Sequence, residues 1–246
     1  MDQSAEGVTR RLTFAIARSA VSIGIAAAVV GQLATSIGFW RTRGDERIDL
    51  DVANFLSFFT IQSNVLAAVV LMVGAVFIVR NRRPRWFLYF RASAATYMVT
   101  TGIVYNLLLR GIELPQGSTV GWSNEILHLI APLYLLLDWI FAPDGRAVRW
   151  KGVGIIVVYP IVWAAYTLVR GPLILDQGTG ATFWYPYPFL NPNGPGGYGT
   201  VAIYVVAIAV AILLVASGVI WFSRRFFDSE PHRESDRAPD EVRPSR

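Results

Sequence analysis

The chain has 246 residues, of which 54% are hydrophobic and only 16% are charged, and it contains no cysteine. Soluble domains carry about 25% charged residues, and the mean hydropathy here is +0.44, so the composition indicates an integral membrane protein. The lack of cysteine excludes disulfides, thiolate metal ligands and cysteine nucleophiles. The net charge of +5 comes mainly from arginines that flank apolar runs, so we expect no nucleic-acid partner.

Six apolar segments approach or exceed the roughly 20 residues that a membrane-spanning helix needs. The length of these runs favours helices over barrel strands, and in lipid a helix satisfies its own backbone hydrogen bonds. The sequence therefore predicts an all-α, polytopic bundle of six transmembrane helices in a single domain over residues 1–227. The expected spans are residues 12–40, 52–79, 86–109, 122–141, 152–169 and 199–222.

Arginine placement predicts the orientation of the bundle. Basic residues cluster before the first span and after the second, fourth and sixth, whereas the loop from Gly171 to Tyr198 has none. Because positive charge is enriched in cytoplasmic loops, we expect both termini in the cytoplasm and the protein in the cell membrane. Residues 228–246 are polar and proline-containing, so we expect a disordered cytoplasmic tail.

Polar residues inside the spans point to function because they are costly in a membrane. Thr60 lies 8 residues after Val52 and His128 lies 6 residues after Trp122, which correspond to depths of about 12 Å and 9 Å below the same leaflet. The two side chains are thus expected at a similar depth. Pro132 leaves the His128 carbonyl without its helical hydrogen-bond partner, so the helix should bend beside the imidazole.

A hydroxyl becomes a useful nucleophile when a neighbouring base accepts its proton, and histidine suits that role. We therefore expect Thr60 and His128 to form a catalytic pair for acyl transfer. An oxyanion or a substrate would be held by polar and aromatic groups nearby: Asn64, Asn124, Gln62, Tyr105, Tyr185, Tyr187 and Phe189. Tyr185, Tyr187 and Phe189 would also cover the mouth of the site. Glu125 is three residues from His128 and is poorly placed to orient it.

Other interpretations of these residues remain open. A threonine in a membrane helix commonly donates to the carbonyl four residues earlier, here that of Leu56. Asparagine and glutamine often join helices, and Asp138 would either snorkel or pair with an arginine. The same polar groups would equally suit a non-catalytic lipid-binding protein or a proton-coupled transporter, or a structural partner in a larger assembly. We expect no metal and no cofactor, since three ligands cannot be assembled near His128.

Three short stretches occur in a characteristic order. They are FLSFFTIQSN around Thr60, NEILHLIAPLYLLLDW around His128, and FWYPYPFLNP at residues 183–192. Together they resemble the androgen-induced-gene and ADTRP family of six-helix membrane proteins, and more closely its bacterial relatives, the Pr6Pr family. The chain departs from the animal pattern at Glu125 to Leu127, and its loop before the YPFL stretch is longer.

The resemblance implies a threonine hydrolase that cleaves fatty-acid esters of hydroxy fatty acids or similar membrane lipids. On this basis Thr60 would be the nucleophile and His128 the base. The partner would be a membrane lipid or a lipid-like ester.

Overall fold

The computed structural model describes residues 2–112 and 119–227, and the predicted tail at 228–246 lies outside them. Every regular element in these ranges is helical. In chain order they are α1 (Asp2–Arg43), α2 (Ile48–Ser57), α3 (Phe59–Val79), α4 (Arg85–Val104), the π-helix η1 (Tyr105–Leu109), α5 (Gly121–Glu125), the π-helix η2 (Ile126–Ile130), α6 (Ala131–Phe141), α7 (Gly152–Arg170), the 3-10 helices η3 (Gly171–Leu173) and η4 (Pro188–Leu190), and α8 (Gly197–Phe227).

Six helices are long and apolar enough to cross a membrane, as the sequence predicts. They are Ala5–Arg43, Phe59–Val79, Arg85–Leu109, Gly121–Phe141, Gly152–Leu173 and Gly197–Phe227. The bounds agree with the predicted spans to within a few residues, except that α1 begins earlier and α8 ends later. The second predicted span is also not one helix, because a break at Phe58 separates α2 from α3.

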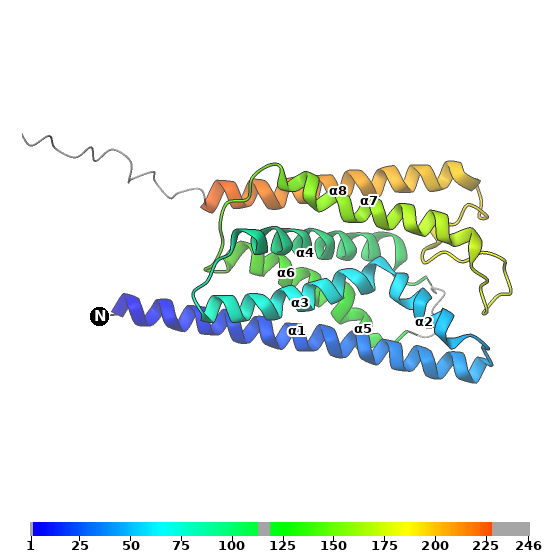
Figure 1. Ribbon diagram of the computed structural model, residues 1–246, viewed down its shortest axis with the longest axis horizontal. Helices are drawn as coiled ribbons and strands as arrows, with labels where there is room; N and C mark the ends of the chain where they lie inside the picture. Colours follow the sequence, from blue (N-terminus) through cyan, green and yellow to red (C-terminus); the bar gives the residue numbers. More distant parts are fainter. Residues whose placement is uncertain (1, 113–118, 228–246) are drawn as a thin grey trace, which may run out of the picture.

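The helices run roughly along one axis, with α1 and α3 on one side, α4 and α6 in the middle, and α7 and α8 on the other side (Figure 1). In the most apolar stretch of each helix, at least half of the residues of α3 and α4 are buried, against 22% of those of α7 and α8. Helices α3 and α4 are therefore central, and α7 and α8 are peripheral. Small residues of α4 (Ala92, Ala94, Ala95) are almost completely buried and allow close helix packing.

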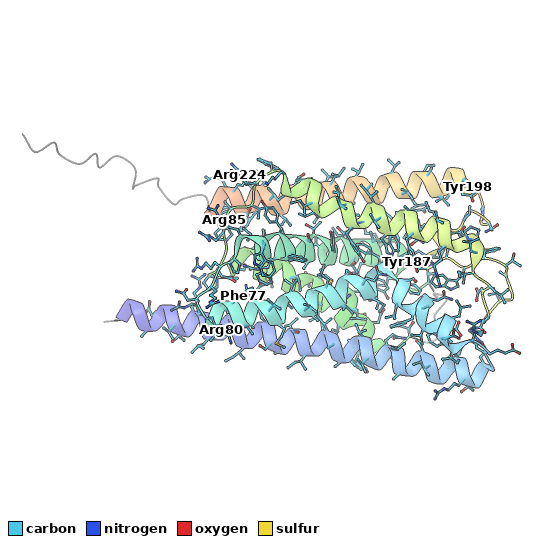
Figure 2. The ribbon with its side chains drawn as sticks, in the orientation of Figure 1. Phe77, Arg80, Arg85, Tyr187, Tyr198 and Arg224 are labelled. Carbon is cyan, nitrogen blue, oxygen red and sulfur yellow. The ribbon has the colours of Figure 1, made fainter. Side chains whose placement is uncertain are left out.

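The start of α1 and the end of α8 lie at the same end of the bundle (Figure 1). Arg80, Arg85 and Arg224 lie at that end, and Tyr198 lies at the opposite end (Figure 2). The arginine-rich turns therefore share one face, as the orientation argument requires. That this face is cytoplasmic stays a prediction from the sequence.

Four buried charged residues join α1, α4, α6 and the turn after α6. Arg18 donates to both carboxylate oxygens of Asp138, at 2.7 and 3.0 Å, and to both of Asp144, at 2.9 and 2.8 Å. Arg91 forms ion pairs of 3.1 Å with each aspartate. Burial raises the pKa of Asp144, but attraction to Arg91 and Arg18 outweighs it, so this pKa lies below its usual range. Asp138 thus pairs with arginines, one of the two roles expected for it.

Candidate functional site

Thr60 lies in the first turn of α3, just after the break at Phe58. Neither proline nor glycine causes the break, and side chains satisfy the carbonyls that it frees. The Gln62 amide donates to the Leu56 carbonyl at 2.8 Å, and the Trp163 indole donates to the Ser57 carbonyl at 2.9 Å. The break places Thr60 where backbone N–H groups have no partner within the helix.

The hydroxyl of Tyr187 occupies this free helix end. The Thr60 backbone N–H donates to the Tyr187 oxygen at 3.2 Å, and the two hydroxyls are also 3.2 Å apart. Tyr187 is held by edge-on contact with Phe58 and by stacking on Phe189. The alternative in which Thr60 donates to the Leu56 carbonyl is wrong, since among the described residues the Thr60 hydroxyl contacts Tyr187, while the Leu56 carbonyl accepts from Gln62.

Burial raises the pKa of the Tyr187 phenol, against the opposing effect of its contacts with Thr60. The group therefore stays neutral and keeps its proton. Because its oxygen already accepts from the Thr60 N–H, the phenol proton is free to point at the Thr60 hydroxyl oxygen. In that arrangement the Thr60 hydroxyl proton has no fixed acceptor and can move to a base.

The helix that carries His128 is irregular, as Pro132 predicts. Residues Ile126–Ile130 form a π-helix, and the freed His128 carbonyl accepts from the Asn106 amide at 3.1 Å. A Cβ on Gly102 would lie 2.9 Å from the Pro132 Cβ, so α4 approaches this point closely only because residue 102 is glycine. π-Helical turns are frequent at functional sites.

Two contacts orient the His128 ring. Its Nδ1 lies 2.9 Å from the Asn124 carbonyl oxygen, and its face stacks on Tyr105 at a centroid distance of 3.7 Å. A carbonyl can only accept, so Nδ1 carries the proton and the neutral ring holds its lone pair at Nε2. The orienting group that the sequence did not reveal is therefore a backbone carbonyl. Glu125 instead pairs with Arg110 at 2.9 Å.

Thr60 lies between two cavities. One is large and apolar, about 280 Å³, and is bounded by α4, α7, α8 and the loop that carries Tyr187. The other is about 40 Å³, is more polar, and is lined by Thr60, Asn124, His128 and Gln32. The structure thus brings Thr60 and His128 to one cavity from two different helices. Among the described residues no hydrogen bond joins them directly, which is common in catalytic pairs without substrate.

The other predicted site residues fall into two groups. Tyr105, Tyr187 and Phe189 line the large cavity, and Asn124 lines the small one while its amide donates to the Tyr105 hydroxyl at 2.6 Å. Asn64, Gln62 and Tyr185 do not line either cavity. The Asn64 amide donates to the Thr60 and Leu127 carbonyls, at 2.9 and 3.2 Å, so its donors are already committed.

Several residues of the site gave no signal in the sequence. Trp163 and Thr100 line the large cavity, and Phe58 and Gln32 line the small one. Phe58 is two residues before Thr60 in the sequence, but the other three come from three different helices, and nothing in their spacing links them to Thr60. In the described residues no group of three histidines or carboxylates is placed to hold a metal ion.

These features define the class of protein: an all-α bundle with six helices suited to a membrane and an internal site where a hydroxyl and an imidazole share a cavity. No protein-family model, curated protein or solved structure matches the chain. The resemblance to the androgen-induced-gene and ADTRP family therefore rests on the three motifs alone.

Proposed function

We propose that this chain is an integral membrane hydrolase that cleaves lipid-like carboxylic esters, with Thr60 as nucleophile and His128 as general base. The observation that carries the proposal is that Thr60 and His128 line one cavity, with the imidazole lone pair at Nε2. The resemblance of the three motifs supports the same two roles. With cytoplasmic termini, the site would lie beneath the outer leaflet of the cell membrane.

In the first step Nε2 of His128 accepts the Thr60 hydroxyl proton while Oγ1 attacks the ester carbonyl carbon. The bond from this carbon to the alcohol oxygen then breaks, and the imidazolium returns the proton to the departing alcohol. The products are an acyl-threonine and a free alcohol. Water then loses a proton to Nε2 and attacks the acyl carbon. The bond from the acyl carbon to Oγ1 then breaks, the free acid leaves, and the imidazolium returns its proton to Oγ1 of Thr60.

The tetrahedral intermediate needs donors for its oxyanion. The Thr60 N–H and the Tyr187 hydroxyl, which bond to each other in this structure, lie beside the Thr60 hydroxyl, and the helix dipole favours negative charge there. Because the Asn64 and Gln62 amides are occupied elsewhere, the helix end and Tyr187 replace them in this role.

A fluorophosphonate probe tests the nucleophile. Oγ1 would form a bond to phosphorus while the phosphorus–fluorine bond breaks and fluoride leaves. We expect the purified protein to be labelled, Thr60→Ser to retain labelling, and Thr60→Ala to lose it. His128→Gln should slow labelling by about 10²–10⁴-fold, the usual contribution of a general base.

Thr96→Ala is the matched control, because the buried Thr96 hydroxyl lines neither cavity and has no hydrogen-bond partner among the described residues. It should label as the wild type does. Equal labelling of Thr60→Ala and wild type would contradict the assignment.

A further inference from the structure

The two cavities differ in which of the two proposed catalytic side chains lines them, and this difference indicates how an ester would be oriented in the site. Thr60 lines both cavities, whereas His128 lines the small one. If the proposed function holds, the imidazolium must donate a proton to the departing alcohol oxygen, so that oxygen must face His128. The alcohol portion of the ester then lies in the small cavity, and the acyl portion must point the other way, into the large one.

The large cavity suits an alkyl chain. Val205, Ile208, Ala209, Ile212 and Leu213 line it from one face of α8, at the spacing of successive helical turns. Pro160, Ile161 and Ala164 line it from α7 in the same pattern. Most of the lining is therefore apolar, and its few hydroxyl groups include those of Thr60, Tyr187 and, on α4, Thr100 and Thr101.

The cavity opens sideways, toward where lipid would lie. Ile161 is 63% exposed and Leu213 is 43% exposed, yet both also line the cavity. A chain can thus enter between α7 and α8 without crossing the polar loops. Both helices are peripheral and little buried, so their separation costs few contacts.

Cavity dimensions limit both arms of the ester. From Val205 to Leu213 the α8 wall extends about 12 Å along the helix, the length of an extended chain of roughly ten carbons. The small cavity of about 40 Å³ holds about three water-sized groups, since one water needs about 10–15 Å³ on this scale. An alcohol with a long chain does not fit there.

We propose that the substrate is a medium-chain acyl ester of a small alcohol, with the acyl chain of about ten carbons between α7 and α8 and the alcohol beside His128. This inference rests on the proposed hydrolase function. It predicts strong dependence of rate on acyl length and equally strong discrimination against large alcohols.

The acyl arm is tested with ethyl esters of straight-chain acids from butyrate to palmitate, measured as release of free acid by the purified protein in detergent. Burial of each methylene strengthens binding by about fourfold, so kcat/KM should rise up to about decanoate and then level off or fall. Ala209→Phe narrows the cavity and should lower the ratio of kcat/KM for decanoate over butyrate by about tenfold or more.

Ala207→Phe is the matched control, since Ala207 is exposed on the same helix and does not line the cavity. Its chain-length profile should equal that of the wild type. On α7, Ala164→Phe and Ala165→Phe provide a second pair of the same design, because Ala164 lines the cavity and Ala165 does not. The second pair decides the outcome if one α8 variant fails to fold.

The alcohol arm is tested with decanoate esters of ethanol and octanol. The ethyl ester should be turned over at least tenfold faster. A flat chain-length profile, equal shifts in Ala207→Phe and Ala209→Phe, or equal rates for the two decanoates would overturn the inference while leaving Thr60-dependent hydrolysis intact. Lack of Thr60-dependent hydrolysis with every ester would overturn the proposed function and, with it, the inference.

Discussion

Replacement of Arg18 by methionine should destabilise this protein more than most single changes. Arg18 donates five hydrogen bonds: two to Asp138, two to Asp144 and one to the Gly74 carbonyl. Methionine fills much of the same space but leaves two buried carboxylates facing Arg91 alone. The cluster then changes from neutral to one net negative charge.

The magnitude follows from the cost of leaving a buried charge without its partner. Removal of one partner of a buried ion pair costs about 3–5 kcal/mol, even where the intact pair adds little compared with an apolar substitute. For a chain of this size, each kcal/mol shifts the melting temperature by about 2–4 °C. We therefore expect Arg18→Met to melt about 6–20 °C below the wild type.

Thermal unfolding in detergent, followed by tryptophan fluorescence, measures the shift. Arg82→Met is the control, because Arg82 is exposed and a surface substitution usually changes stability by less than about 0.5 kcal/mol. The double variant Arg18→Met with Asp144→Asn restores neutrality and should recover part of the loss. A shift no larger than that of Arg82→Met, or a double variant less stable than Arg18→Met alone, would refute the charge argument.

Three further predictions follow from single contacts. Tyr187→Phe keeps the aromatic packing but removes the hydroxyl near Thr60, so kcat for ester hydrolysis should fall about 10²-fold while KM changes little. Gly102→Ala places a Cβ against Pro132 and should cost about 1–3 kcal/mol in thermal unfolding, whereas Gly24→Ala meets open space and should not destabilise. Burial raises the pKa of Asp51 to about 6; the folded state therefore favours the protonated form, and its stabilisation is lost as the pH rises through about 6. Thermal unfolding should therefore occur at a lower temperature at pH 7.5 than at pH 5, and Asp51→Asn, which does not titrate, should reduce that difference.

The sequence alone was sufficient to predict the spans. Their length and lack of charge correspond directly to the thickness of a bilayer, so six runs give six helices. That Thr60 and His128 line one cavity was in keeping with the sequence, because depth below one leaflet can be counted along a helix. Pro132 likewise predicted the irregular turn at His128, since loss of one N–H has a fixed local consequence.

Other features depend on contacts between distant segments and left no local pattern. The break at Phe58 has no glycine or proline, and it depends on an indole from α7 that meets the Ser57 carbonyl. The Tyr187 contact with Thr60 joins residues 127 positions apart. The sequence placed Arg91 inside a span without indicating its partners, because an arginine can face several aspartates and only the fold selects among them.

The irregular backbone around the site favours a functional role for these residues over a role in packing alone. Three helices depart from regular geometry here: the break before Thr60, the π-helix that begins at Tyr105 and the π-helix around His128. In a membrane each freed backbone group is costly unless a partner satisfies it, and side chains such as Gln62 and Asn106 are used for that purpose. Continuous helices would bury the same apolar surface without these additional hydrogen bonds. Departures of this kind gather where a protein must hold reactive groups in a defined position, and here they lie beside Thr60, His128 and the Tyr105 ring that stacks on His128.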